Sequence, residues 1–281
     1  MSLSDLVRPA RRTAIVDIGA NPIDGDPPYK SLLSSGLCTL IGFEPQVQAL
    51  QRLNDAKGAN ETYLPYVIGD GGPATLHHCR AEGMTSLLKP DPLRLAAFND
   101  FEFFGTVLRK EAVQTRRLDD IAEVTECDFL KLDIQGGELA ALEGGRQKLA
   151  QCVAIQTEVS FCPIYENQPP VGAVDTALRQ LGFIPHCFAE LKRWPISPAV
   201  VNGNRRAPLN QLLEADLVYV RDFTRPNAMT AEQMKHLALL AHYCYRSFDL
   251  TLRMLTSLAE GNHIDAEAPA RYMASVSDPV A

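Results

Sequence analysis

The chain has 281 residues, of which 46% are hydrophobic and 22% are charged, a composition that is typical of globular proteins and excludes wholesale disorder. Because 34 Asp and Glu outnumber 27 Lys and Arg, the formal net charge is −7, which argues against a nucleic-acid binder with a basic face. No apolar run reaches the roughly 18–20 residues of a membrane span, and residues 1–12 lack a signal-like apolar stretch, so we expect a cytoplasmic protein.

Strands and helices alternate in the first part of the chain. Residues 1–12 form a lead-in, and apolar, β-rich runs at 14–18, 38–43 and 63–68 predict the first three strands. Asp26-Pro27-Pro28 indicates a helix start between the first two strands, and Gly36 indicates its end. Glu44-Pro45 opens a second helix that runs to about residue 54.

The alternation returns after a less regular stretch at 74–117, in which residues 75–78 could form a hairpin strand. Further strands are predicted at 128–134, 153–159, 183–188 and 215–220, with helices at 138–149 and 174–181. Strands that alternate with helices imply βαβ units. We therefore expect one α/β domain over 13–223, built on a Rossmann-like, mostly parallel sheet of about seven strands.

The composition shifts after residue 223. Thr230 and Gln233 match a capping box, and no Gly or Pro occurs from Ala231 to Glu260, which predicts one helix of about 45 Å. Its apolar residues recur at heptad-like spacing. Two interpretations remain open: a helix that covers the core of its own chain, or a homodimer through residues 231–260. The helical extension would cover 224–261, and residues 262–281 would form a flexible tail.

Acidic residues follow the strong apolar runs. In an open parallel sheet, ligands bind outside the carboxyl ends of the strands. A set of acids along one such edge therefore indicates a binding site. The acids at or just after a strand end are Asp17, Glu44, Asp70, Asp133 and Glu158.

The turn after the first strand indicates which ligand this edge binds. Gly19 permits a close backbone approach, but the turn lacks the GxGxxG pattern, and Pro22 keeps Asn21 extended. Both features count against a dinucleotide cofactor. Glu44 lies 25 residues after Gly19, at the position where a carboxylate usually binds ribose hydroxyls. An adenosine ligand without a pyrophosphate, such as S-adenosyl-L-methionine, fits this pattern.

Four segments resemble the FkbM-type family of S-adenosylmethionine-dependent methyltransferases, over roughly residues 13–190. In chain order they read VDIGAN from Val16, GFEP from Gly42, RLDDI from Arg117 and KLDIQGGE from Lys131. The resemblance implies a class I methyltransferase fold and O-methylation of a sugar or a similar secondary product.

The resemblance also implies roles for particular residues. Asp17, Gly19 and Asn21 would line the methionine part of the cofactor, Glu44 would hold the ribose, and Asp70 would lie near the adenine. The family commonly has an acidic residue where this chain has Gln135, so one carboxylate would be missing on the acceptor side.

Two carboxylates are candidates for catalysis. Asp133 would act as the general base or orient the acceptor, with cofactor contact and helix capping as alternatives. Glu158, on the next strand, would bind the acceptor. Glu138 is expected to stabilise its helix N-terminus. No metal site is expected, because neighbours such as His77 and His78 point to opposite faces of a strand.

The sequence thus predicts a methyltransferase that acts on a small-molecule or glycan hydroxyl. Trp194, the only tryptophan, is either a platform for a sugar ring or a packing residue. Two other functions remain open. One is a dinucleotide-dependent oxidoreductase, and the other is a non-catalytic assembly protein whose C-terminal helix mediates oligomerisation.

Overall fold

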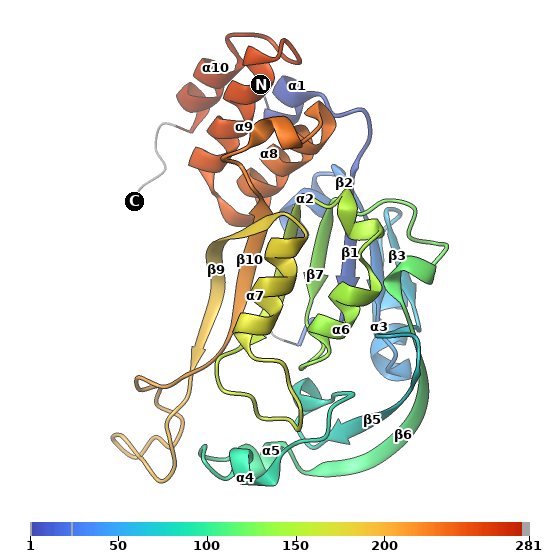
Figure 1. Ribbon diagram of the computed structural model, residues 1–281, viewed down its shortest axis with the longest axis vertical. Helices are drawn as coiled ribbons and strands as arrows, with labels where there is room; N and C mark the ends of the chain where they lie inside the picture. Colours follow the sequence, from blue (N-terminus) through green and yellow to red (C-terminus); the bar gives the residue numbers. More distant parts are fainter. Residues whose placement is uncertain (1, 24, 277–281) are drawn as a thin grey trace.

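The computed structural model describes residues 2–23 and 25–276, which fold around one seven-stranded sheet (Figure 1). Five strands are parallel, and the sixth in spatial order is antiparallel to both of its neighbours. The predicted mostly parallel sheet is therefore confirmed. From edge to edge the strands are β3 (Glu61–Leu64), β2 (Cys38–Phe43), β1 (Thr13–Ile18), β7 (Phe129–Leu132), β8 (Ala154–Ser160), β10 (Leu212–Arg221) and β9 (Phe183–Arg193).

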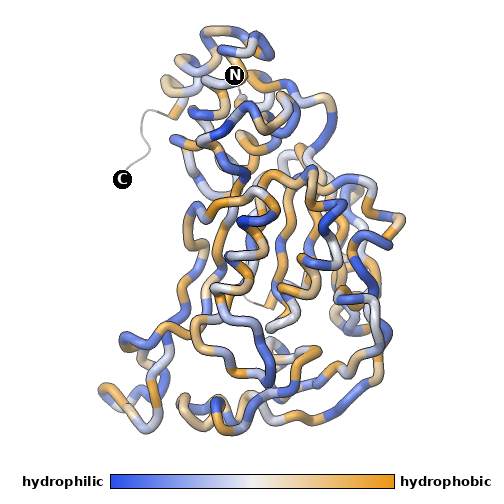
Figure 2. Tube along the Cα trace, viewed as in Figure 1, coloured by the Kyte–Doolittle hydropathy of each residue, from blue (hydrophilic) through white to orange (hydrophobic). Residues whose placement is uncertain are grey.

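Helices cover the two faces of this sheet. Helices α6 (Glu138–Gly144) and α7 (Val171–Gln180) pack on one face, where Val16, Leu130 and Ile155 are buried. The opposite face buries the alternate residues of the same strands against α2 (Lys30–Ser34) and the C-terminal helices. Figure 2 shows the hydrophobic residues concentrated in the strands between these layers. Helix α3 (Val47–Ala56) connects β2 to β3.

A second, three-stranded sheet lies beyond the carboxyl ends of the main strands (Figure 1). Its strands are β4 (Val67–Ile68), β5 (Pro73–Cys79) and β6 (Val107–Arg116), and the short helices α4 (Pro92–Leu95) and α5 (Phe101–Phe104) lie between β5 and β6. The prediction of a single strand at 63–68 is wrong, because the chain leaves the main sheet at Pro65, which has no N–H for a ladder. The predicted hairpin strand at 75–78 is part of β5.

The predicted single helix from Ala231 to Glu260 is wrong. The chain forms α8 (Ala231–Tyr245) and α9 (Phe248–Glu260), separated at Arg246, whose φ of 52° is left-handed. The two helices pack on each other, and Leu237, Thr251 and Leu255 of the predicted stripe are buried inside the chain. The break therefore converts a long exposed helix into a compact bundle that shares its core with the sheet.

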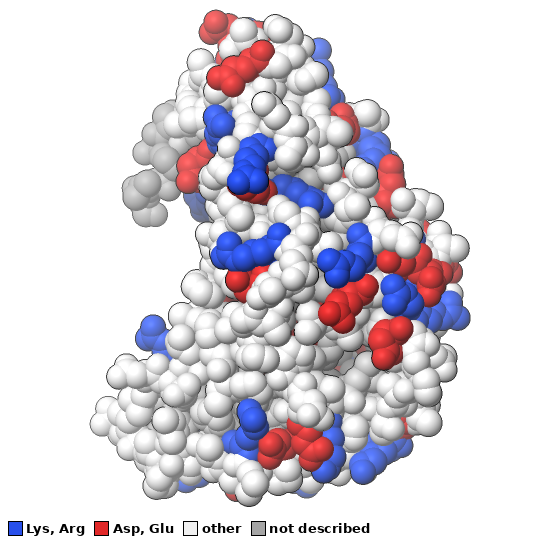
Figure 3. Space-filling view, in the orientation of Figure 1, with Lys and Arg blue, Asp and Glu red and all other residues white. Residues whose placement is uncertain are grey.

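The predicted flexible tail from residue 262 is also wrong for its described part. Helix α10 (Ala268–Ser275) packs on α9, and its Tyr272 is buried. Residues 277–281 lie outside the described residues. The lead-in contains helix α1 (Leu3–Val7), which contacts α8 and α10. None of the helices in the described part of the chain is both long enough and apolar enough to cross a bilayer. Acidic and basic side chains are interspersed on the face of the molecule that Figure 3 shows.

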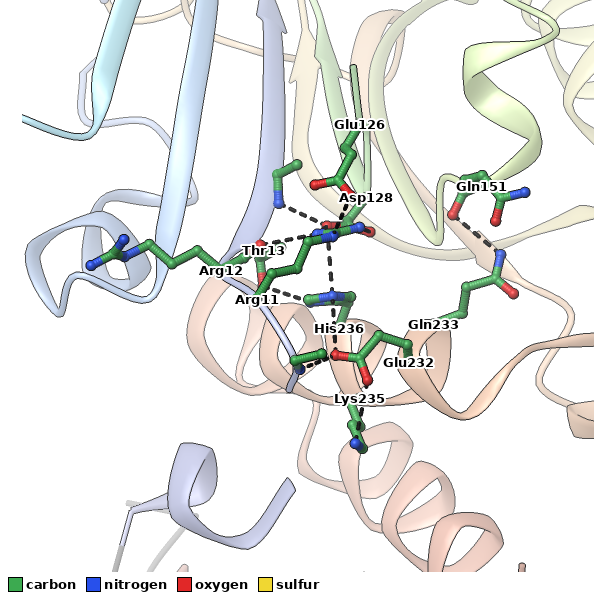
Figure 4. Close-up of polar contacts among 12 residues, drawn as sticks. Arg11, Arg12, Thr13, Glu126, Asp128, Gln151, Glu232, Gln233, Lys235 and His236 are labelled. Atoms are coloured by element: carbon green, nitrogen blue, oxygen red, sulfur yellow. Dashed lines mark hydrogen bonds and ion pairs between the residues drawn. The ribbon is translucent and has the colours of Figure 1, made fainter. Parts of the chain in front are cut away.

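A buried polar network joins the bundle to the amino end of the sheet (Figure 4). The Arg11 guanidinium donates to both oxygens of Asp128, at 2.5 and 3.0 Å, and the Ala14 amide donates to the same carboxylate at 2.7 Å. His236 of α8 lies 3.1 Å from the Thr13 hydroxyl of β1. This network fixes the bundle at the end of the sheet opposite to the acidic edge.

Candidate active site

A cleft opens on the bundle side of the sheet, near the carboxyl ends of the strands. The apolar residues that pack on the bundle, such as Ile15 of β1 and Phe129 of β7, are followed two positions later by Asp17 and Lys131. The bundle covers the apolar part of this face, and the polar part forms the wall of an open cavity of about 930 Å³. Residues from α2, β9 and β10 and from the last turn of α8 complete its lining.

A second, smaller cavity of about 110 Å³ adjoins the cleft. Glu44 lines it at the end of β2, and apolar side chains line it from three strands, namely Phe43, Ile68 and Leu76. Residues 82–87, which follow β5, also contribute to the lining. The residues common to both cavities are Gly19, Asn21, Ile23, Asp133 and Gln135.

Asp17 is held at the edge of the cleft by two partners. The Tyr29 hydroxyl donates to Oδ2 at 2.5 Å, and Lys131 Nζ lies 3.7 Å from Oδ1. Oδ1 is buried and has no hydrogen-bond partner within the described structure. Burial raises the pKa of Asp17, although the charge of Lys131 and the bond from Tyr29 oppose this shift. Asp17 therefore presents an unsatisfied acceptor beside the cleft.

The turn after β1 has the backbone geometry that its glycine permits. Gly19 has a φ of +88°, and a Cβ there would lie 2.0 Å from the Asp133 carbonyl oxygen. Asn21 donates its side-chain N–H to Glu82 at 3.0 Å, which links this turn to the segment on the far side of the small cavity.

Glu44 is 3% exposed, and its Oε1 accepts a 2.7 Å hydrogen bond from the Gln46 amide. Burial raises the pKa of Glu44 to about 7, with that backbone bond acting in the opposite direction. The carboxyl group therefore changes its charge within the physiological pH range when the cavity holds no cation.

Asp133 and Glu158 are neighbours, both bonded by Gln135, and their pKa values shift in opposite directions. Burial, followed by the nearby charges of Glu214 and Asp133, raises the pKa of Glu158 well above its usual value. Burial also acts against ionisation of Asp133, but the charge of Lys131 and the hydrogen bond from Glu158 keep its pKa below the usual value. The pair is therefore best described as ionised Asp133 beside protonated Glu158.

Gln135 connects this pair, a role that the sequence analysis missed. Its Nε2 donates to Asp133 Oδ1 at 3.2 Å and to Glu158 Oε2 at 2.6 Å. The Tyr165 hydroxyl donates to its Oε1 at 3.1 Å, and the Ser86 hydroxyl donates to its backbone carbonyl at 2.7 Å. Its φ of 56° is unusual for a residue with a Cβ, and such strain clusters at functional sites.

Two further carboxylates from β10, Glu214 and Asp216, line the cleft. Lys192 of β9 forms an ion pair with Glu214, and Gln156 donates to Asp216 at 2.7 Å. These acids were missed because β10 is antiparallel, so its amino end, rather than its carboxyl end, lies at this edge. A search of the sequence for acids at strand starts would have found them once the direction of the last strand was known.

One predicted cofactor residue is not brought to the site. Asp70 is exposed, belongs to the lining of neither cavity, and accepts bonds from the Gly72 amide and the Thr115 hydroxyl at 2.8 and 3.2 Å. Its displacement follows from the departure of the chain from the main sheet at Pro65. Asp70 therefore lies in a turn of the second sheet, outside the lining of both cavities.

Other candidates have structural roles. Glu138 accepts the Ile134 and Gly136 amides at 3.0 and 3.1 Å, so it stabilises the turn before α6 as expected. Trp194 donates to the Asn99 carbonyl at 2.9 Å and packs edge-on against Phe101, which confirms the packing interpretation.

Comparisons with known proteins agree with this architecture. A family model described as "Methyltransferase FkbM domain" matches residues 17–185. The "2-O-methyltransferase NoeI" of Sinorhizobium fredii (strain NBRC 101917 / NGR234) is 28% identical over 172 residues, which are 57% of this chain and 68% of the relative.

Two solved structures are similar at a greater distance. One is magnesium protoporphyrin IX methyltransferase (ChlM) from Synechocystis PCC 6803 with bound S-adenosylmethionine, with a TM-score of 0.39, 9% identity and coverage of 75% of this chain and 71% of that chain. The other is precorrin-6y C5,15-methyltransferase from Geobacter metallireducens GS-15, with a TM-score of 0.34, 14% identity and coverage of 78% and 82%.

Proposed function

The chain belongs to the methyltransferase FkbM family, and from this premise we propose that it methylates a hydroxyl group of a sugar, glycan or related secondary metabolite. It is a methyltransferase with S-adenosylmethionine as its cofactor. The relative named as a 2-O-methyltransferase supports an oxygen acceptor. The observation that carries the proposal is the contact between the two cavities, because Asp133 and Gln135 line both.

Residues of the small cavity and of the adjoining wall of the cleft fit the cofactor. The buried Glu44 carboxylate is suited to the two ribose hydroxyls, which need hydrogen-bond acceptors. Gly19 leaves its turn free of a side chain, and the unpartnered Oδ1 of Asp17 offers an acceptor to a cationic group nearby. We therefore assign Asp17, Gly19, Asn21 and Glu44 to cofactor binding and leave Asp70 out.

When bound, the cofactor supplies an electrophilic methyl group on a positively charged sulfur. The protein must then bring an acceptor oxygen close to that methyl group in line with the bond that breaks, so positioning supplies much of the acceleration. The larger cleft is wide enough for such an acceptor, and the shared wall is where acceptor and cofactor would meet.

Asp133 is the group that takes the acceptor proton in this proposal. It stays ionised at neutral pH, and it lies on the shared wall of the two cavities. Glu158, which is protonated, lies beside Asp133 without a competing negative charge, and Gln135 holds both groups from one side. A general base within hydrogen-bond reach typically contributes about 10²–10⁴-fold to the rate.

Two measurements test this function. Calorimetry with S-adenosylhomocysteine should show binding that Glu44→Ala removes, while Glu143→Ala, a control at an exposed glutamate outside both cavities, should leave it intact. Transfer of a labelled methyl group to a panel of sugars and polyketide alcohols should then give a product whose label resists mild base, as an ether does. Absence of binding at millimolar cofactor would contradict the proposal.

A further inference from the structure

The lining of the cleft is too acidic to favour an acceptor that carries a negative charge. Among the described residues of its lining are eight acidic and four basic side chains. Three of the basic groups are already paired. Lys30 bonds Asp26 at 2.6 Å, Lys131 lies 3.7 Å from Asp17 and 3.9 Å from Asp133, and Lys192 bonds Glu214. Arg246, which lies over the Phe248 ring, is the one basic side chain of this described lining without a recorded ion pair, so an anionic acceptor would face a clear majority of acidic groups.

Carboxylates and amides are also the side chains that hydrogen-bond sugar hydroxyls. Glu158, Gln156 and Asp216 line the inner wall of the cleft, and their side chains carry the oxygens and nitrogens that bond hydroxyl groups. The polar lining thus suits a neutral, hydroxyl-rich molecule.

An exposed aromatic ring stands at the outer end of this polar wall. Phe188 of β9 is 53% exposed and lines the cleft, and the Phe161 ring lies behind it with centroids 6.5 Å apart. An exposed phenyl ring gains free energy when an apolar surface covers it, and the C–H face of a pyranose is such a surface.

The backbone presents Phe188 and its neighbours to the cleft through an irregularity in β9. Leu217 of β10 pairs with Phe188, whereas the preceding residue, Asp216, pairs with Glu190. The extra residue, Ala189, forms a bulge, and residues 188–190 all line the cleft. A regular strand would turn alternate residues away, and bulges commonly redirect side chains beside active sites.

We propose that Phe188 and Glu190 form an acceptor subsite that binds a sugar ring without an acidic group. The ring stacks on Phe188, its hydroxyls reach the carboxylates of the cleft, and Glu190 disfavours uronates and phosphorylated sugars. This inference rests on the proposed function, since it names the substrate class of the same site.

The test is a direct binding measurement that does not require the natural acceptor. Cellotriose, chitosan trisaccharide and trigalacturonate are each titrated into the full chain saturated with S-adenosylhomocysteine, with ligand-observed NMR as the readout. We expect the neutral and amino trisaccharides to bind and the trigalacturonate to bind at least tenfold more weakly. Phe188→Ala should weaken the neutral ligand at least tenfold. Phe103→Ala, at another exposed phenylalanine outside both cavities, should leave the affinity unchanged.

A second variant tests the role of the Glu190 charge. Glu190→Lys should bring trigalacturonate to within about threefold of the neutral trisaccharide, whereas Glu102→Lys, an exposed glutamate outside the cleft, should change nothing. The subsite would be overturned if the wild type bound trigalacturonate more tightly than the neutral trisaccharide. It would also be overturned if Phe188→Ala bound the neutral trisaccharide with full affinity, or if the wild type bound neither the neutral nor the amino trisaccharide. If S-adenosylhomocysteine binds while all sugars fail, only the subsite is wrong. If neither binds, the proposed function is wrong.

Discussion

The side-chain amide of Gln135 lies 2.6 Å from Oε2 of Glu158, although 23 residues separate them in the chain. Gln135 follows β7, and Glu158 lies near the end of the neighbouring strand β8. The same amide also reaches Asp133, so one donor orders both predicted catalytic carboxyl groups. Which of these two groups carries the negative charge decides how the site responds to substitution and to pH.

Asp133 and Glu158 should respond differently to the loss of their acidity. Asp133→Asn removes the ionised carboxylate and should lower kcat by about 10²-fold or more, the usual contribution of a general base. Glu158→Gln replaces a protonated acid by an amide that also donates a hydrogen bond, so kcat should stay within about tenfold of the wild type. Single-turnover methyl transfer at saturating cofactor measures both. The opposite order would show that Glu158 is the base.

Gln135→Glu should move the pH profile of kcat. The substitution removes a donor that stabilises ionised Asp133 and adds a negative charge beside it, so the pKa of Asp133 rises. The acidic limb of the profile should therefore shift to higher pH. Gln180→Glu, on the exposed surface of α7, supplies the matched control. A lower kcat without any shift of the profile would mean that Gln135 is only a structural element.

Cofactor affinity should depend on pH through Glu44. Its pKa of about 7 means that the carboxyl group is largely protonated at pH 6 and ionised at pH 8. If the ribose hydroxyls favour the carboxylate, binding releases a proton, and affinity should rise about tenfold from pH 6 to pH 8. Calorimetry across this range measures the change with S-adenosylhomocysteine. Glu44→Gln should bind more weakly, with affinity nearly independent of pH.

The C-terminal bundle should unfold together with the sheet. Leu255 is fully buried in the cluster that also contains Ile15 and Phe129, so Leu255→Ala should lower the free energy of unfolding by about 2–5 kcal/mol. Trp194 packs among α5 residues rather than in the bundle, so its fluorescence reports on a different part of the chain. Fluorescence and far-UV circular dichroism should give coincident transitions. Leu108→Ala, at a side chain that is 63% exposed, should cost far less.

Two separate transitions in the wild type would contradict the shared core. In that case the signal of Trp194 would persist after the helical signal of the bundle had fallen. Loss of stability in Leu108→Ala equal to that in Leu255→Ala would likewise show that the effect does not come from the buried cluster.

The sequence alone determined the sheet and most of one edge of the site. Apolar runs that end at Asp17, Glu44, Asp133 and Glu158 carry enough local information, because strand periodicity and the position of parallel strand ends follow from short segments. The family resemblance was likewise contained in these segments, and the family match confirms it.

Only the tertiary structure decided how distant segments meet. In the folded chain, Asp70 lies outside both cavities, whereas Glu214 and Asp216 line the cleft. Gln135 bonds both Asp133 and Glu158. The predicted long helix is interrupted at Arg246, although no Gly or Pro in the sequence marks this position. The physical reason is common to all these cases. Packing and burial between segments far apart in the chain outweigh local propensity by several kcal/mol, and no window of sequence contains both partners.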